Sequence, residues 1–227
     1  MKNENKRLST IDIIYETIKQ NIIELKFEPN QHLVESTLAT KLGVSRTPLR
    51  HALYRLELEG LLIKRSNGRI IVSPMSIQEA KELFLVREVI EGLIAREATL
   101  NIASSEDFSS IINRLEDIVF LMRKSAETNR QEDVVSYGSN FHNKLKKYSN
   151  NITAVNMLEQ INNRVARYRR LGAYKDPKYA SIIPVEEHEE VLKHIKSKDE
   201  ASAETAMRNH IVRSLKSTIA AISYLSF

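Results

Sequence analysis

Apolar residues recur at helical spacing along most of this 227-residue chain, and this periodicity restricts its fold more than any other feature of the sequence. From Ser76 onward there is almost no strand signal. Only 6% of the residues are aromatic, and Leu, Ile, Ala, Glu and Lys dominate, a composition that favours helices. The sequence therefore predicts a mainly α-helical protein.

The chain is long enough for two domains of ordinary size. A run typical of strand, turn and strand ends near Pro74, so we predict one domain at residues 1–75 and another at 76–227. The second is expected to be an antiparallel all-α bundle of about six helices, with a Pro- and Tyr-containing loop near 173–183. The expected helices are 76–101, 105–127, 131–148, 152–171, 184–197 and 199–225.

The excess positive charge lies almost entirely in the first domain. Residues 1–75 carry 12 Lys and Arg against 8 Asp and Glu, whereas residues 76–227 carry 22 against 21. A small basic domain joined to a larger, nearly neutral one is typical of a protein whose head binds a polyanion while its body has another task.

Several classes of protein are excluded by what the sequence lacks. It contains no Cys, so it has no disulfide, thiolate metal ligand or thiol nucleophile. The charged N-terminus is not followed by the apolar run of a secretory signal, and no run reaches the ~20 apolar residues of a membrane span. We therefore expect a soluble, intracellular protein with no membrane partner.

The first domain carries the pattern of a helix-turn-helix. Helices are predicted at 10–26, 35–42 and 46–59, with Ser9 and Asp12 as a capping box for the first helix. Gly43 ends the second helix, and Ser45 is a good N-cap for the third. Two helices joined by a tight turn that contains Gly make this motif.

A basic hairpin follows the third helix. The strands Leu61–Arg65 and Arg69–Val72 are joined at Asn67-Gly68, where both residues accept a positive φ. A hairpin in this position is a wing, whose tip can lie along the minor groove or the phosphate backbone. The first domain is therefore predicted to be a winged helix-turn-helix.

The third helix has one polar face suited to reading DNA. Leu49, Ala52, Leu53 and Leu56 would point to a core, and the opposite side would enter the major groove. Arg in the first turn of such a helix can bind the O6 and N7 atoms of guanine, while short hydroxyl side chains bind phosphate or a base edge. The predicted DNA-binding residues are Ser45, Arg46, Thr47, Arg50, Asn67, Gly68 and Arg69.

These residues resemble a known family. The run LATKLGVSRTPLR from Leu38 to Arg50, continued by RLELEGL at 55–61 and by Gly68-Arg69, is similar to the winged helix of GntR-family bacterial transcriptional regulators. His51 departs from the Glu that is usual in the family. The resemblance implies a homodimer that binds an inverted repeat in double-stranded operator DNA, in the bacterial cytoplasm.

Three histidines of the second domain carry a further resemblance. Phe141-His142, Glu187-His188 and the MRNH run that ends at His210 are similar to the FCD ligand-binding domain of the FadR-like branch of this family. The resemblance implies that these three His, with an Asp one turn before the first, hold a divalent metal such as zinc or nickel. Here that position is Gly138, which has no side chain.

Metal binding therefore has an alternative in this chain. Three neutral imidazoles can still hold zinc or a similar ion, with water or an effector in the open positions. The other possibility is a metal-free polar cavity that binds the effector directly. Ser139 and Asn140 lie near but lack the helical phase of the missing Asp. We expect His32, His51 and His194 to be ordinary surface residues.

An open metal site inside a bundle favours a small carboxylate effector clamped by Arg, whose planar fork matches a carboxylate. Arg87, four residues before Glu91, resembles the Arg-x-x-x-Glu signature of the first helix of the domain. A structural salt bridge to Glu91 is the alternative role for Arg87. Arg164 and Arg167 are further effector-binding candidates.

The leading hypothesis is a transcriptional regulator, and not an enzyme, whose operator binding is modulated by a small organic acid, with a His-bound metal in the bundle. One alternative is a three-His metalloenzyme with an accessory basic domain. Against it, neither a general base beside the histidines nor a Gly-rich phosphate loop is evident. The other alternative is a metal-free binding protein for small molecules.

Overall fold

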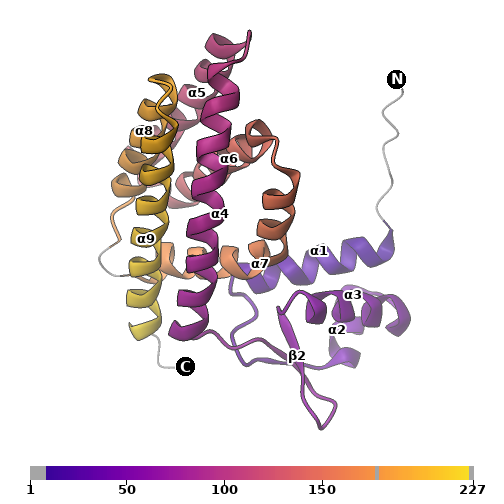
Figure 1. Ribbon diagram of the computed structural model, residues 1–227. Coiled ribbons are helices and arrows are strands. Elements are labelled where there is room, and N and C mark those ends of the chain that lie inside the picture. The colour runs from indigo at the N-terminus through magenta and orange to yellow at the C-terminus, as the bar shows by residue number, and fades with distance from the viewer. Residues whose placement is uncertain (1–8, 177–178, 225–227) are drawn as a thin grey trace. The chain divides into compact units, whose positions relative to one another are not determined.

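The computed structural model describes residues 9–176 and 179–224, which contain nine helices and three short strands (Figure 1). The chain divides into two compact units, one ending at Met75 and the other beginning at Ser76. Each unit has a buried apolar cluster of its own. The chain is mainly α-helical, as the periodicity predicted.

Three helices form the frame of the first unit: α1 (Thr10–Ile23), α2 (Glu35–Leu42) and α3 (Arg46–Leu58). The capping box of α1 is confirmed, because the Ser9 hydroxyl accepts a bond from the Asp12 amide and the Asp12 carboxylate accepts one from the Ser9 amide. The expectation that this helix continues to residue 26 was wrong. It stops at Ile23 because the chain turns at Leu25, whose φ is +58°.

The three strands form a small antiparallel sheet in the order β1-β3-β2. β2 (Leu62–Lys64) and β3 (Ile70–Val72) are the predicted hairpin, whereas β1 (His32–Leu33) was not foreseen because two residues carry no periodicity. Ile71 lies opposite both His32 and Ile63.

The hairpin turn differs from the expectation that both of its central residues have a positive φ. Only Gly68 does, at +79°. The Gly68 amide donates to the Arg65 carbonyl at 2.8 Å, and the Arg65 amide donates to the Arg69 carbonyl at 2.8 Å. This pattern fits a three-residue loop that ends in a left-handed glycine.

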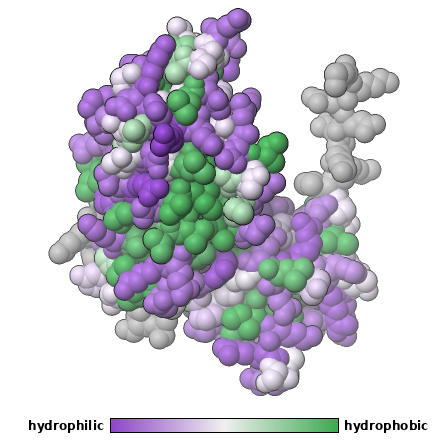
Figure 2. Space-filling model, viewed as in Figure 1, coloured by the Kyte–Doolittle hydropathy of each residue, from purple (hydrophilic) through white to green (hydrophobic). Residues whose placement is uncertain are grey.

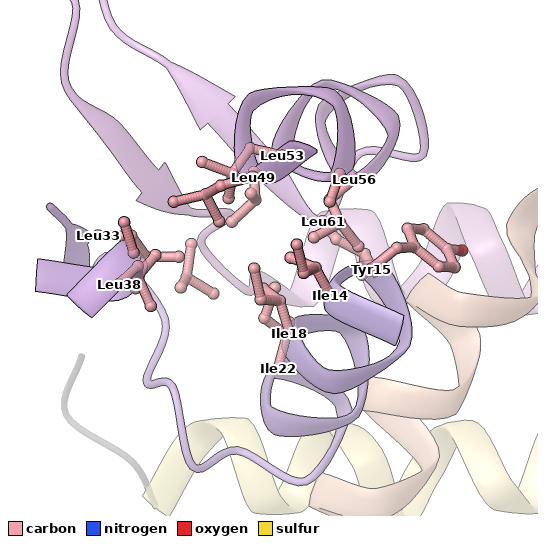
Figure 3. Packing of buried hydrophobic residues seen from close by; sticks show 14 residues of the cluster. Ile14, Tyr15, Ile18, Ile22, Leu33, Leu38, Leu49, Leu53, Leu56 and Leu61 are labelled. Carbon is pink, nitrogen blue, oxygen red and sulfur yellow. The ribbon is translucent and has the colours of Figure 1, made fainter. Parts of the chain in front are cut away.

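The core of the first unit lies between α1 and α3 (Figure 3). Ile14, Ile18 and Ile22 point from α1 toward Leu49 and Leu56 of α3, and all five side chains are almost completely buried. Burying one such side chain contributes roughly 1.5–3 kcal/mol, so these contacts fix α3 against α1. The opposite face of α3 is left at the surface.

The described residues of the second unit form six helices, as predicted. α4 and α9 lie side by side along their length (Figure 1). No helix in the described residues is long and apolar enough to cross a membrane. The six helices are α4 (Ile77–Ala103), α5 (Phe108–Glu127), α6 (Gln131–Ser149), α7 (Ile152–Lys175), α8 (Ile182–Lys196) and α9 (Glu200–Tyr224).

The loop predicted at 173–183 is shorter than expected, and residues 177–178 lie outside the described part of the chain. α7 continues to Lys175, and α8 begins at Ile182. Pro184 does not delay the start of α8, because it falls in the first turn, where a backbone N–H has no partner within the helix.

α7 and α9 approach closely at Gly172. A Cβ built on Gly172 would lie 2.9 Å from the Thr218 hydroxyl oxygen and 3.1 Å from the Thr218 amide nitrogen. Backbone atoms cannot move aside as a flexible side chain can, so this crossing requires a residue without a side chain. At Gly138 of α6, by contrast, a Cβ would meet its nearest neighbour, the Met122 methyl group, at 3.4 Å.

Gly172→Ala should therefore lower the free energy of unfolding by about 1–3 kcal/mol, the usual cost of overpacking a core. Gly138→Ala is the matched control. It should be neutral or should stabilise by about 0.5–1 kcal/mol, because Ala is the better helix former. Urea unfolding of both variants measures the difference. Equal stability of the two variants would contradict the close contact at Gly172.

Candidate functional site

The polar face of α3 is exposed, as the sequence predicted. Thr47, Arg50, His51 and Tyr54 line a shallow depression on this face. Ser45 occupies the N-cap position, but its hydroxyl makes no capping hydrogen bond. Ser45, Arg46 and Thr47 are all exposed, so the start of α3 is open to solvent.

The two arginines of this face differ in their surroundings. The Arg50 Nε atom donates to Glu35 of α2 at 2.8 Å, a pair that the sequence analysis did not predict. Arg46 is exposed and forms no ion pair within the described ranges. At the tip of the wing, the Asn67 side-chain oxygen accepts a bond from the Arg69 amide at 3.1 Å, and the Arg69 side chain is exposed.

A polar cluster fixes the far end of α3 against α1. The Tyr15 hydroxyl donates to the Glu59 carboxylate at 2.7 Å, and Arg55 donates to Asp12 at 2.8 Å. The Arg55 guanidinium lies 4.0 Å from the centre of the Tyr15 ring. Burial, with the Glu59 carboxylate, raises the pKa of Tyr15, which keeps its hydroxyl protonated as a donor.

Three histidines from three different helices meet inside the second unit. His142 lies on α6, His188 on α8 and His210 on α9, and their exposed fractions are 5%, 3% and 5%. One ring nitrogen of each lies within 4.8 Å of the others. The bundle thus brings together residues that are 68 positions apart in the sequence.

The Nδ1 atom of each imidazole contacts an oxygen atom that fixes the orientation of the ring. His188 Nδ1 lies 2.5 Å from the Pro184 carbonyl oxygen, His210 Nδ1 lies 2.7 Å from a Glu187 carboxylate oxygen, and His142 Nδ1 contacts Glu91. A carbonyl oxygen only accepts, so His188 must carry its proton on Nδ1 and a lone pair on Nε2. The carboxylates favour the same tautomer at the other two rings.

Burial also keeps the imidazoles neutral. It lowers the pKa of all three, and for His188 and His210 the neighbouring histidines lower it further. Burial opposes ionisation of Glu91, but Arg87 and His142 outweigh it and hold the pKa of this carboxyl well below its usual value. An ionised Glu91 therefore accepts from a neutral His142.

This arrangement fits a divalent metal of intermediate softness, such as zinc or nickel. The Nε2 atoms of His142 and His188 are buried and have no hydrogen-bond partner among the described residues. Neutral imidazoles whose other nitrogen donates to a carboxylate or a backbone carbonyl are the usual metal-binding form. The three histidines supply three ligand atoms and leave further coordination positions open.

Two cavities adjoin the histidines. One, of about 40 Å³, is lined by Gly138, His188, His210, Arg213 and Tyr179 among others. The second, of about 120 Å³, is lined by residues that include Arg87, Glu91 and His142. Arg169 lines both cavities, and burial lowers its pKa to about 10. The surroundings of the histidines are therefore rich in cationic donors.

The arginines predicted to bind an effector lie in different places. Arg87 donates through Nε to Glu91 at 2.5 Å, which is the salt bridge that the sequence left open as its alternative role. Its buried Nη1 has no partner among the described residues. Arg164 donates to Glu79 near the start of α4, where the Tyr168 hydroxyl also binds. Neither Arg164 nor Arg167 lines either cavity beside the histidines.

Sequence reasoning missed three residues of this site. Glu187 and Glu91 stood inside the motifs around His188 and Arg87, so their positions were visible although their bonds to Nδ1 atoms were not. Arg169 had no signal of its own. It lies in a run of arginines on α7, and only the packing of the bundle shows which member faces the cavities.

Comparison with known proteins finds a family model for each of the two units. The model of the FCD domain matches residues 82–213, and the model of the gntR family of bacterial regulatory proteins matches residues 10–72. The chain belongs to the GntR family. It is a DNA-binding transcriptional regulator of the type that carries an FCD domain.

This GntR-family chain has relatives along nearly its whole length. It is 26% identical over 196 residues to the HTH-type transcriptional regulator YdhC of Bacillus subtilis (strain 168), covering 86% of this chain and 85% of that one. It is 24% identical over 202 residues to the HTH-type transcriptional repressor RspR of Escherichia coli (strain K12), covering 87% and 84%. The solved structure of E. coli McbR/YncC shares the fold, with a TM-score of 0.77 at 18% identity over 96% of this chain and 100% of that one.

Metal binding at the three histidines should be measurable as a gain in thermal stability. Zinc or nickel added to metal-free protein should raise the melting temperature, because an ion at a hundred times its Kd adds about 2.7 kcal/mol. His188→Gln should abolish this rise. His194→Gln, on the same helix but outside the cluster, should retain it. A rise that survives His188→Gln would show that the ion binds elsewhere.

Proposed function

We propose that this regulator senses a small organic acid together with a divalent metal, zinc or nickel, at His142, His188 and His210, and that binding there modulates its affinity for operator DNA. The observation that carries the proposal is the convergence of three buried imidazoles, each held from behind at Nδ1, beside cavities lined by Arg. A metal in such a site would act as a Lewis acid that binds a carboxylate. The arginines would neutralise the negative charge of that carboxylate.

The effector-binding residues of this proposal are arginines. Arg87 lines the cavity beside His142 and has a buried donor without a partner, so it is well placed to bind a carboxylate. Arg169 joins it, since it lines both cavities. Arg164 stays a prediction on sequence grounds, but its bond to Glu79 gives it a structural role near the start of α4.

The DNA-binding part of the proposal rests on the exposed first turn of α3. Arg46 and Arg50 would read guanine in the major groove, and Ser45 and Thr47 would bind phosphate or a base edge. Asn67, Gly68 and Arg69 at the tip of the wing would follow the phosphate backbone or the minor groove. The domains 1–75 and 76–227 would thus divide the work of binding DNA and sensing the ligand.

An apolar stripe on α4 supports a homodimer. Figure 2 shows a hydrophobic patch over α4, and the exposed fractions of its members lie between 39% and 62%. An exposed patch of this kind on a helix marks an interface, and two copies of one stripe complement each other across a two-fold axis. Two-fold symmetry also matches an inverted repeat in DNA. The stripe consists of Leu85, Val86, Val89, Leu93 and Leu100.

A dimer of this kind can hold its two DNA-binding domains in more than one arrangement. A ligand that binds one arrangement more tightly shifts the populations, and so changes how well the dimer fits adjacent half-sites. Because regulators of this family bind operator DNA, the proposal includes a location in the bacterial cytoplasm. Repression and activation are both compatible with this scheme, although the relative RspR is named a repressor.

A three-His metalloenzyme is the second candidate, because three His and an open position also make a catalytic zinc site. The two carboxylates next to the rings weigh against it. Glu91 and Glu187 are both bound to Nδ1 atoms and to arginines, so neither is free to act as a general base.

Two substitutions separate base reading from backbone binding. Arg46→Ala should weaken binding to DNA from the promoter region of the protein's own gene by about 1–3 kcal/mol, which is roughly five- to 150-fold in Kd, and should relax base preference. Arg69→Ala should weaken binding to all sequences and reduce the slope of log affinity against log salt by about one. Fluorescence anisotropy at several salt concentrations measures both. Unchanged affinity and base preference in Arg46→Ala would refute the assignment.

The dimer is tested at the centre of the stripe. Val89→Asp would bury an unpaired carboxylate, which costs roughly 3–5 kcal/mol, so dimerisation should weaken by more than about a hundredfold. Ile152→Asp is the control, since Ile152 is 74% exposed at the first turn of α7, where an acidic residue is favourable. Sedimentation velocity reports the mass of each variant. A Val89→Asp protein that remains dimeric would place the interface elsewhere.

A further inference from the structure

Gly138 leaves space directly beside the ring of His188. A Cβ built there would lie 3.6 Å from the Nε2 atom of His188, the buried atom that has no hydrogen-bond partner in the described chain. A carboxylate on that Cβ would therefore reach the space that the three lone pairs share. Glycine leaves this space to the cavity of about 40 Å³, which Gly138 itself lines.

The cavity is large enough for more than a single water. By the same measure one water molecule needs roughly 10–15 Å³, so the space accepts a few waters or one carboxylate group. The second cavity, of about 120 Å³, adds room beside His142. Since Arg169 lines both, a ligand with two acidic groups could occupy both spaces and meet the same guanidinium.

The charges around the histidines are unbalanced without a ligand. Four cationic side chains line the cavities, Arg87, Lys146, Arg169 and Arg213, against one carboxylate, Glu91. Glu187 pairs with Arg213 and Glu159 pairs with Lys146, so one positive charge remains in excess. A divalent ion on three neutral imidazoles would add two more. Buried charge of one sign is costly unless it is neutralised nearby, and no side chain at 138 does so.

We propose that Gly138 makes metal binding depend on a dianionic co-ligand, so that a small dicarboxylate and the metal bind the histidine site together and neither binds tightly alone. One carboxylate takes the coordination position that an acidic side chain at 138 would fill, and the other meets Arg169. This inference rests on the metal and the organic acid of the proposed function. It adds that the two are sensed as a pair.

Coupling of this kind is reciprocal, because the factor by which the acid tightens metal binding equals the factor by which the metal tightens acid binding. The regulator would then respond only when both are present. An aspartate at 138 would break the coupling, since it supplies one negative charge and one metal ligand permanently.

The test measures the zinc affinity of the metal-free full-length protein by competition with a chromophoric chelator, alone and with malonate, succinate or malate. The His188→Gln protein is the blank that corrects for zinc bound by the acids in solution. At least one of the acids should tighten zinc binding to wild type by about 5- to 150-fold, the range of ordinary coupling energies.

Two variants at the same position carry the comparison. Gly138→Asp should bind zinc tightly without any acid, and the acids should no longer change its affinity. Gly138→Ala adds the Cβ without the carboxylate and should keep the acid dependence of wild type. Thermal unfolding of each metal-free variant checks that it folds.

Three results would overturn the inference. If wild type binds zinc equally with and without every acid, the inference fails while metal binding in the proposed function stands. If an acid binds equally with and without zinc, the inference fails while the organic acid effector stands. If neither zinc nor any acid binds wild type or Gly138→Asp, the inference and the sensing part of the proposed function fail together.

Discussion

The hydrogen bonds behind the three imidazoles determine what the helical domain can bind. An imidazole buried in an apolar bundle has two nitrogens to satisfy, and here an oxygen beside each ring accepts a hydrogen bond from its Nδ1–H group. The other nitrogens then face one another as lone pairs, an arrangement that is unfavourable unless a cation or a donor lies between them. The packing of the helices thus sets the tautomer of each ring, and the tautomer sets which ligand the site favours.

α4 links this constraint to the surface of the domain. On its buried side Glu91 binds both Arg87 and His142, so the charge on this carboxylate depends on the histidine site. On its exposed side it carries the apolar stripe. A single helix therefore has one face toward the proposed ligand and one toward the proposed partner subunit, which is a short physical route between them.

The sequence predicted the helices well because their apolar spacing is regular and their caps are explicit. Ser9 with Asp12 and Gly43 each act through bonds within one helix or turn, so local rules suffice. Errors arose where the chain has no periodic signal. The early stop of α1 and the three-residue turn of the wing are local turns, whereas the two-residue strand β1 depends on its pairing with β3.

The site was predictable to the extent that its residues stand in motifs. His142, His188 and His210 were singled out by resemblance, but spacing alone could not show that their rings meet. Arg169 escaped notice, and Arg164 was favoured over it, because neighbouring arginines on one helix differ only in phase. The direction in which each points depends on how α7 packs against its neighbours.

The bond between Arg50 and Glu35 has a consequence for how DNA is recognised. Glu35 accepts from Nε, at the inner edge of the guanidinium, and thereby fixes the plane of the group before DNA arrives. A side chain that is already oriented loses less conformational freedom when it binds, so less of the binding energy is spent on ordering. If Arg50 reads a base as proposed, α2 would contribute to sequence recognition without touching a base, because Glu35 sets the orientation of the guanidinium on the neighbouring helix.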